Sequence, residues 1–263
     1  MKKSAFLVVN SALVLLLLLG VWQTLVTVNH VQPYILPGPG VVASALGARL
    51  PSLLNSLWIT TQEAAGGLAV SILAGVAIAL TFAQWRPLRQ LVYPYTILLQ
   101  TVPIVAIAPL IINWEGPGMI AVMTVSFIIS VAPIIANTTQ GLISVDENLV
   151  QLFQMHSATP AQILFLLRLP NALPYLFTGI RIAAGISVVG AITGELFAGS
   201  SRVGEGGLGY AILYANNQME TAFMFALVFA ATVLGFGFFF LVMLCEWLAL
   251  HNWHESKRSA SEE

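Results

Sequence analysis

Residues 56–83, SLWITTQEAAGGLAVSILAGVAIALTFA, decide the fold class of this chain. Glu63 is the only charged residue in this stretch, and nearly all the others are apolar or small. A helix that crosses a bilayer needs about 20 mostly apolar residues, because each residue rises about 1.5 Å along the helix axis. The stretch therefore predicts a transmembrane helix.

The composition of the whole chain agrees with this prediction. Its 263 residues are 58% hydrophobic and 8% charged, whereas a soluble domain carries about 25% charged residues. Most of the surface is therefore expected to face lipid. The net charge of −1 offers no basic surface, so no nucleic-acid partner is expected. The single cysteine, Cys245, excludes an internal disulfide and is interpreted as a small apolar side chain.

Five further segments share this composition, so the chain is predicted to be all-α and polytopic, with about six transmembrane helices. We expect these helices at residues 5–28, 56–83, 91–112, 118–141, 171–198 and 222–249. The first apolar run is longer than the roughly 7–15 residues of a signal-peptide core. Residues 1–29 are therefore interpreted as an uncleaved N-terminal transmembrane helix.

Lysine and arginine positions predict the orientation in the membrane, because cytoplasmic loops carry an excess of these residues. With a cytoplasmic N-terminus, the outside segments hold only Arg49 and Arg202, while Arg181 lies within a span. The inside segments then hold Lys2, Lys3, Arg86, Arg89, Arg168, Lys257 and Arg258. Both termini, including the tail 251–263, are thus predicted to be cytoplasmic.

Two long segments are predicted to lie outside the spans. Residues 30–55 form a periplasmic segment whose four prolines exclude one long helix. Residues 142–170 form the longest cytoplasmic loop of a core that extends over 56–250. Their sequence predicts short amphipathic helices that break near Pro160 and end at Pro170. This loop is the only cytoplasmic segment long enough to bind a soluble partner.

Charged side chains within spans are costly, at about 2.5–3.5 kcal/mol near the centre of a helix. Glu63 is therefore expected to face the bundle interior, with Gln100 as one candidate partner. Arg181 and Glu195 also need an interior partner or a place near an interface. The candidates for a translocation pathway are Glu63, Gln100, Asn137 and Glu195. Small residues that favour close helix packing recur at Gly67, Ser71 and Gly75.

Sequence motifs for catalysis are missing from the chain. No P-loop, G-x-S-x-G or H-E-x-x-H pattern occurs, so no catalytic, metal or cofactor site is expected. Residues 204–209 (GEGGLG) fit G-x-G-x-x-G, but a dinucleotide site needs a βαβ unit around it. They are interpreted as a flexible loop outside the membrane. The residues alone thus describe a six-span protein with one partner-binding loop, which leaves a secondary transporter or a non-transporting scaffold open.

The order of short motifs along the chain resembles the permeases of type I ABC importers, in the branch that handles nitrate, sulfonates, taurine and thiamine-precursor pyrimidines. The matching motifs lie at 36–39 (LPGP), 86–89 (RPLR), 93–94 (YP), 99–103 (LQTVP), 106–110 (AIAPL), 114–118 (WEGPG), 132–138 (APIIANT), 169–174 (LPNALP), 178–181 (TGIR), 194–195 (GE) and 207–210 (GLGY). The resemblance covers nearly the whole chain, and its strength lies in the order and spacing of the motifs.

This resemblance implies a five-helix permease core plus the first span, placed in the bacterial inner membrane. It implies a second permease copy or close relative, two ABC ATPase subunits that bind ATP and Mg, and a periplasmic or lipid-anchored substrate-binding protein. The cargo would be a small solute, either a nitrate- or sulfonate-like anion or a pyrimidine-type thiamine precursor. The permease itself would bind no cofactor, and its other partner would be membrane lipid.

One departure from the family pattern falls in the cytoplasmic loop. Such permeases carry an E-A-A…G motif there, which docks into a cleft of the ATPase subunit. Its glutamate and two alanines fall on Gln151, Leu152 and Phe153, and its glycine falls on Ser157. The ATPase-coupling residues are therefore expected to be Gln151, Leu152, Phe153, Gln154, Met155, His156 and Ser157. We expect apolar packing there, with hydrogen bonds from Gln151, Gln154 and His156.

Overall fold

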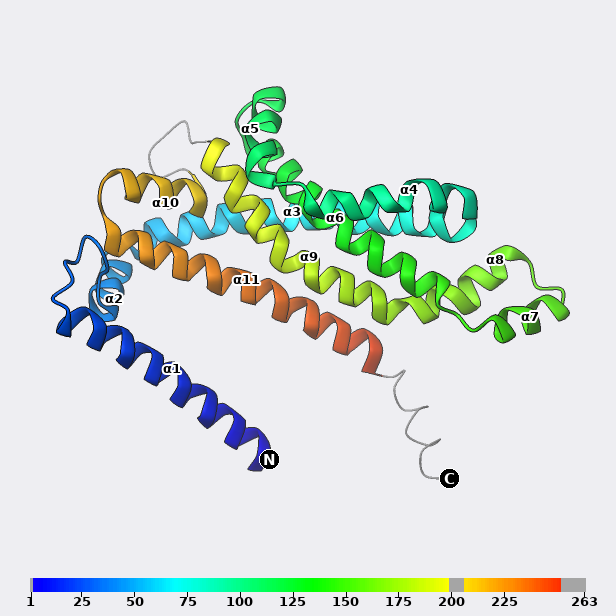
Figure 1. Cartoon of the computed structure of the whole chain (residues 1–263), viewed down its shortest axis with the longest axis horizontal. Coiled ribbons are helices and arrows are strands. Elements are labelled where there is room, and N and C mark those ends of the chain that lie inside the picture. The colour runs from blue at the N-terminus through cyan, green and yellow to red at the C-terminus, as the bar shows by residue number, and fades with distance from the viewer. Residues whose placement is uncertain (1, 199–205, 252–263) are drawn as a thin grey trace.

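The computed structural model describes residues 2–198 and 206–251, and side chains from Leu13 onward in the first helix together with that of Asn10. All regular elements in these residues are helical (Figure 1). They are α1 (Lys2–Val28), α2 (Pro39–Ala48), α3 (Leu50–Gln84), α4 (Arg86–Leu98), η1 (Leu99–Thr101), α5 (Ile104–Glu115), α6 (Met119–Ile143), α7 (Glu147–Met155), α8 (Pro160–Ile163), η2 (Leu164–Arg168), α9 (Leu169–Ala198), α10 (Leu208–Asn217) and α11 (Thr221–Leu250).

Helix α6 lies at the centre of the bundle, where it packs most extensively against α9 and α3. Small residues allow this close approach, as the sequence predicted. A Cβ atom on Gly67 would lie 2.5 Å from Ser126 Oγ and 2.9 Å from the Met123 carbonyl oxygen. Gly75 approaches Ile134 in the same way, so one face of α3 rests directly on α6.

Buried hydroxyl groups connect these three helices. Ser71 of α3 donates a hydrogen bond to the Phe127 carbonyl of α6 at 3.1 Å. Ser126 of α6 donates to the Ser187 carbonyl of α9 at 2.9 Å. Polar contacts of this kind complement close packing in a bilayer, where lipid tails are as apolar as the helices themselves. Helices α3, α6 and α9 therefore form one tightly joined unit.

Four helices are long and apolar enough to cross a membrane within the described residues: Leu50–Gln84, Met119–Ile143, Pro160–Ala198 and Thr221–Leu250. The pair α4–α5 makes a fifth if it counts as one bent span. The described side chains of α1, Leu13–Val28, form a shorter apolar stretch. The all-α, multi-span prediction is confirmed, and a sixth span requires α1.

The expected span at 91–112 is not one straight helix. The structure divides it into α4 and α5, which are bent by 99° at the break between Thr101 and Ile104. Pro103 has no backbone N–H, and it restricts Val102 to an extended conformation with ψ 124°. Helix α5 consequently leaves the bundle at a steep angle (Figure 1).

The expected helix end at Pro170 is also wrong. The helix that begins at Pro160 continues through Pro170 to Ala198. A π-helical turn, η2, immediately precedes this proline, and Leu169 N donates to the Leu164 carbonyl. The wider turn makes room for a ring that would otherwise clash with a carbonyl one turn earlier. One continuous rod thus joins the loop predicted to be cytoplasmic to the far end of α9.

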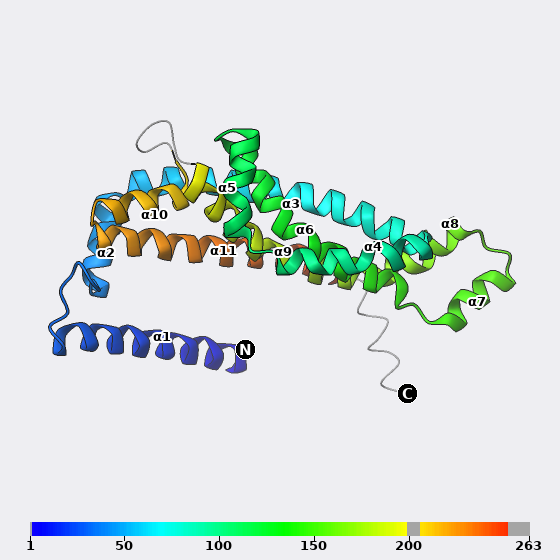
Figure 2. The same cartoon turned by 45° about the horizontal axis from the view of Figure 1, so that its top comes forward.

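The segment after the first helix agrees with the prediction that prolines prevent one long helix. It contains α2, and α3 then begins at Leu50 with Pro51 in its first turn. This start is earlier than the expected residue 56. Helix α1 contacts α2, and its Trp22 ring lies 6.1 Å from the Phe225 ring of α11, while the N-terminal end of α1 lies apart from the bundle (Figures 1 and 2).

Gly67→Ala tests the close packing of α3 on α6. The added methyl must displace Ser126 and the backbone of α6, so we expect a loss of about 1–3 kcal/mol, as for an overpacked core. The matched control is Gly235→Ala in α11, where an added Cβ would meet nothing within 4 Å. The measurement is the melting temperature of the purified full chain in detergent. Equal melting temperatures for the two variants would contradict this packing.

Candidate functional site

A buried polar cluster lies at one end of the bundle, which we call the outer end. It consists of Thr60 and Glu63 of α3, Glu195 of α9, and the backbone N–H groups of Leu208 and Gly209 at the start of α10. The exposed fractions of the three side chains are 0% for Thr60, 5% for Glu63 and 3% for Glu195. Three helices therefore place polar groups together out of contact with water and lipid.

Glu195 is the centre of this polar cluster. Thr60 Oγ1 donates a hydrogen bond to Glu195 Oε1 at 2.5 Å, and Gly209 N donates to Oε2 at 2.5 Å. Leu208 N donates to Thr60 Oγ1 at 2.8 Å, so the threonine connects the helix start to the carboxyl group. The N-terminus of a helix also favours a negative charge, because its first N–H groups point outward. Glu195 thus holds the first turn of α10.

Glu63 faces the bundle interior, as predicted. Its carboxyl group lies within hydrogen-bonding reach of that of Glu195, while its Oε2 atom is buried without a hydrogen-bond partner. The suggested pairing with Gln100 is wrong, because Gln100 is exposed in η1. Asn137 instead donates to the Pro133 carbonyl of its own helix at 2.8 Å. The structure thus joins two of the four pathway candidates, Glu63 and Glu195.

The glycine-rich segment before α10 is more ordered than the sequence suggested. Leu208 and Gly209 belong to the first turn of α10, while Gly204 and Glu205 lie outside the described residues. A Cβ atom on Gly207 would overlap the Glu195 carboxyl group, and one on Gly209 would overlap the Ile192 carbonyl oxygen. These glycines are needed because the chain passes so close to α9. The expectation of a flexible loop therefore does not hold for residues 207–209.

Two ion pairs were not predicted. Arg181 of α9 pairs with Glu246 of α11, which provides the interior partner that an arginine within a span requires. Arg49, just before α3, makes a two-pronged contact with Glu220, just before α11. Each pair joins elements far apart in the sequence, so only the helix positions reveal it.

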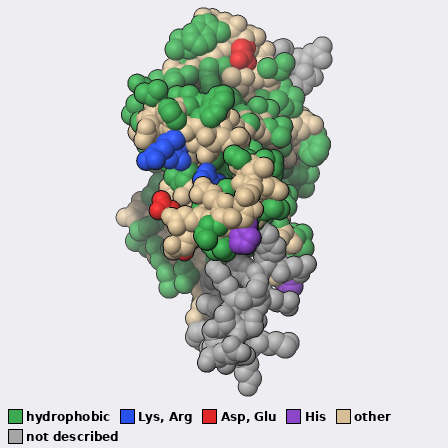
Figure 3. Space-filling model, turned by 90° about the vertical axis from the view of Figure 1, so that its right-hand side faces the viewer, with side chains coloured by type: hydrophobic (Ala, Val, Ile, Leu, Met, Phe, Trp, Pro, Cys, Tyr) green, Lys and Arg blue, Asp and Glu red, His purple; other side chains and the backbone are tan. Residues whose placement is uncertain are grey.

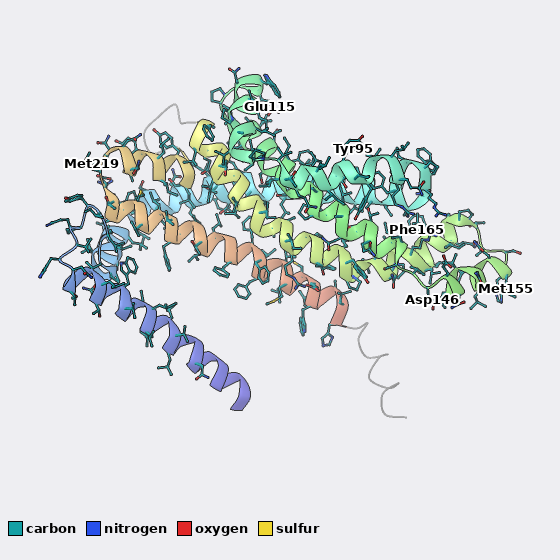
Figure 4. All side chains as sticks on the ribbon, in the orientation of Figure 1. Tyr95, Glu115, Asp146, Met155, Phe165 and Met219 are labelled. Carbon is teal, nitrogen blue, oxygen red and sulfur yellow. The ribbon has the colours of Figure 1, made fainter. Side chains whose placement is uncertain are left out.

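At the opposite, inner end of the bundle, α7 and α8 form a projecting hairpin (Figures 1 and 4). Asp146 caps α7 by accepting a hydrogen bond from Asn148 N at 2.9 Å. All seven expected coupling residues lie on α7 or in the turn that follows it: Gln151, Leu152, Phe153, Gln154, Met155, His156 and Ser157.

The coupling residues differ in where their side chains point. Met155 is 83% exposed and Leu152 48%, whereas Phe153 is half-buried. Gln151 and Gln154 line a hollow of about 310 Å³ between α7 and the bundle, where Arg168 also lies. Hydrophobic side chains are prominent on this end of the molecule, among few charged ones (Figure 3). Leu149, Leu152 and Met155, which we call the apolar cap, are the exposed apolar residues of α7.

Ser157 adopts a left-handed backbone conformation, with φ 57°. Glycine adopts this conformation at little cost, while a residue with a Cβ atom pays a steric penalty. Ser157 is the position at which the family motif has glycine. The turn between α7 and α8 therefore keeps the shape that glycine would provide, although the glycine itself is missing.

Two hydrogen bonds attach the helix that follows the inner hairpin to α3 and α6. Arg168 Nη1 donates to the Ala83 carbonyl at the end of α3, at 3.0 Å. Asn171 Nδ2 donates to the Gly141 carbonyl near the end of α6, also at 3.0 Å. A force on α7 and α8 would therefore reach all three central helices.

An apolar groove of about 540 Å³ lies between α3, α4 and α6. Its aromatic lining residues are Phe82 and Phe127, and its hydroxyl groups come from Thr81 and Thr96. The other lining residues are aliphatic: Ala77, Ile78, Leu88, Val92, Leu99, Ile128, Val131 and Ile135. The groove therefore offers planar and apolar contacts without a charged side chain.

Comparison with known proteins gives a consistent result. Residues 71–246, more than half of the chain, match the family described as "Binding-protein-dependent transport system inner membrane component". A probable ABC transporter permease protein of Haemophilus influenzae is 32% identical over 235 residues, which cover 89% of this chain and 92% of the relative.

Two further relatives have names that include a transported compound. The formylaminopyrimidine transport permease protein ThiX of Halalkalibacterium halodurans is 30% identical, over 89% of this chain and 91% of the relative. The riboflavin transport system permease protein RibX of Chloroflexus aurantiacus is 33% identical, over 92% of this chain and 89% of the relative. The similarity thus extends over nearly the full length of each protein.

Ser157→Gly tests the left-handed turn after α7. Removing the Cβ atom relieves a steric penalty of about 1–2 kcal/mol, although glycine also makes the unfolded chain more flexible. We expect the melting temperature of the purified chain to rise slightly or stay constant. Ser157→Val, a β-branched substitution, should lower it clearly. If valine is tolerated as well as glycine, the left-handed conformation is not present in solution.

Proposed function

Because this chain belongs to the family of binding-protein-dependent transport system inner membrane components, we propose that it imports a small planar heterocycle by alternating access. As an ABC importer permease it is a multi-pass inner-membrane protein that works with ATPase and binding-protein partners. Proteins of this family form the membrane component of the transport system and have no catalytic site and no cofactor of their own. The cargo, the assembly and the coupling surface are our proposals.

The proposed assembly contains two permease copies, or this chain with a close relative, and two ATPase subunits at the inner end. ATP and Mg bind in the ATPase subunits, and a binding protein, periplasmic or lipid-anchored, delivers cargo to the outer end. Both termini face the cytoplasm in this arrangement. The excess of lysine and arginine in the segments on that side supports this orientation.

The apolar cap on α7 is the observation that carries the coupling proposal. Leu149, Leu152 and Met155 are spaced three residues apart, so they lie near one another along the helix. Exposed apolar clusters outside the membrane usually mark a protein interface. We therefore assign the ATPase contact to the apolar cap, with Phe153 packed behind it. Gln151 and Gln154 support α7 from the hollow that they line, and His156 bonds to the Leu152 carbonyl at 2.9 Å.

A lever mechanism follows from the continuity of the helix from Pro160 to Ala198. When ATP closes the ATPase dimer, the hairpin of α7 and α8 moves with the subunit to which it is bound. The rod transmits this motion to α9, and the contacts from Arg168 and Asn171 transmit it to α3 and α6. Each bundle then rocks as one body between inward and outward openings, as alternating access requires.

The apolar groove supports a planar heterocycle as the cargo. Phe127 offers an aromatic contact beside the buried ring of Phe82. The hydroxyl groups of Thr81 and Thr96 donate to carbonyls of their own helix, so their oxygen atoms can accept hydrogen bonds from ring N–H groups. A nitrate- or sulfonate-like anion would favour a cationic partner, yet Arg181, the arginine within a span, is paired with Glu246. The names of two relatives, which refer to formylaminopyrimidine and riboflavin, agree with this choice.

Met155→Asp and Leu152→Asp test the apolar cap. Each places a carboxylate in an apolar interface, where an unpaired charge costs several kcal/mol. A loss of about 1.4 kcal/mol in binding free energy weakens the affinity for the ATPase about tenfold. We expect ATP-driven uptake to fall at least about tenfold while the membrane portion stays folded. Asn148→Asp is the control, because it adds the same charge to an exposed position of α7 that belongs neither to the apolar cap nor to the expected coupling residues.

Salt dependence gives a second measurement on the same surface. An apolar contact is not screened by ions, so the complex with the ATPase should survive high salt during purification. Normal uptake by Met155→Asp, or loss of the ATPase from the unmutated chain in high salt, would refute the apolar cap as the coupling surface.

The cargo class can be measured on the cognate substrate-binding protein. We expect pyrimidine or flavin compounds to raise its melting temperature, because a ligand that binds the folded state stabilises it. Taurine, an aliphatic sulfonate and nitrate are the matched comparison set. Stabilisation by one of these anions alone would overturn the heterocycle proposal and leave the importer function intact.

A further inference from the structure

Glu63 and Glu195 are buried side by side in one polar cluster, where two ionised carboxylates would repel each other. Two ionised carboxylates offer only acceptor atoms, so a hydrogen bond between them forms when one carries an O–H group. Both groups lie deep in the outer end of the bundle, and both belong to spans. The surroundings of each group decide which one carries the proton.

Glu195 has the surroundings of a carboxylate. Each of its oxygen atoms accepts a hydrogen bond, from Thr60 and from Gly209 N, and the start of α10 points toward it. Glu63 differs, because its Oε2 atom is buried and accepts no hydrogen bond from the described residues. The proton therefore belongs on Glu63, which donates it to Glu195.

We infer that these two side chains form a clasp that positions α10, with Glu195 as the carboxylate that anchors the helix and Glu63 as the neutral acid that holds Glu195 in place. The second attachment of α10 lies at its other end. There, Glu220 follows the turn after α10 and pairs with Arg49. Helix α10 is thus fixed at both ends.

The clasp differs from a pathway role for the same residues. In a pathway, a carboxylate would reach cargo or water, whereas both side chains here are at most 5% exposed and are committed to each other and to α10. The clasp also lies next to an exposed surface. Helix α10 leads into the outer turn at Met219, which is 85% exposed near one end of the molecule (Figure 4). The clasp thereby sets the position of this outer surface.

The same substitution should affect the position of α10 differently at the two glutamates. Glu63→Gln retains a donor, because its amide NH2 group can bond to the Glu195 carboxylate. Glu195→Gln replaces one acceptor oxygen by a donor group that faces Thr60 or Gly209 N. Glu63→Met has similar length and no donor. The clasp therefore survives the first substitution and fails in the other two.

Cysteine labelling measures the position of α10 in the full chain. The reporter is Ala215→Cys in a Cys245→Ser background, because Ala215 of α10 is 0% exposed. A membrane-impermeant maleimide is added to right-side-out membrane vesicles. We expect Glu63→Gln to label as slowly as the parent. Glu195→Gln and Glu63→Met should label about tenfold faster, the effect of losing a buried hydrogen bond to a charged group.

Two controls keep the test decisive. Ala132→Cys on α6 reports general unfolding and should remain unlabelled in every variant, because Ala132 is 1% exposed in the bundle core. Should Glu195→Gln fail to accumulate, Gly207→Ala pushes a methyl against the carboxyl group with both glutamates intact, and it should also label faster. Parent-like labelling of both Glu195→Gln and Gly207→Ala would overturn the clasp. Equal acceleration by Glu63→Gln and Glu63→Met would overturn the neutral-acid role.

Discussion

The close packing of α3 and α9 on α6 is the constraint on which the rest of the structure depends. Lipid offers no hydrophobic drive to bring helices together, so contact relies on small residues and buried hydroxyl groups. Gly67 and Ser126 meet at this contact, and Ser126 also bonds to α9. The rotation of the three helices is fixed as a result. Thr60, Glu63 and Glu195 then meet at the outer end, and Arg168 reaches α3 at the inner end.

The continuous helix from Pro160 to Ala198 connects the two ends of this packed unit. Its inner end carries the hairpin with the apolar cap, and its outer end carries Glu195. The same helix therefore touches the surface where an ATPase would act and the cluster that holds α10. An importer permease needs a stiff connection between these two ends, since a loose one would absorb the motion that ATP drives.

Much of this architecture could be predicted from the sequence, and the failures have identifiable physical causes. Apolar length located the main spans, and the small residues of α3 predicted its packing face. Prolines alone did not identify the breaks: Pro103 lies in a break of 99°, while Pro170 is accommodated by a π-helical turn. The partner of Glu63 was also not predictable, because it depends on how two distant helices are rotated. The sequence places Ser157 where the family motif has glycine, but only the structure shows that the backbone keeps the left-handed conformation.

The central claim is that one permease chain moves as a single body, and the distance between its two ends tests this most directly. Spin labels at Met155→Cys and Met219→Cys, in a Cys245→Ser background, would mark the inner hairpin and the outer turn, which are both exposed. With one labelled copy in each assembled transporter, double electron–electron resonance measures the distance between the two spin labels with and without bound ATP. The rigid-body account predicts the same distance in both states. A distance that changes on ATP binding would show that the chain bends between its ends, and it would contradict the account.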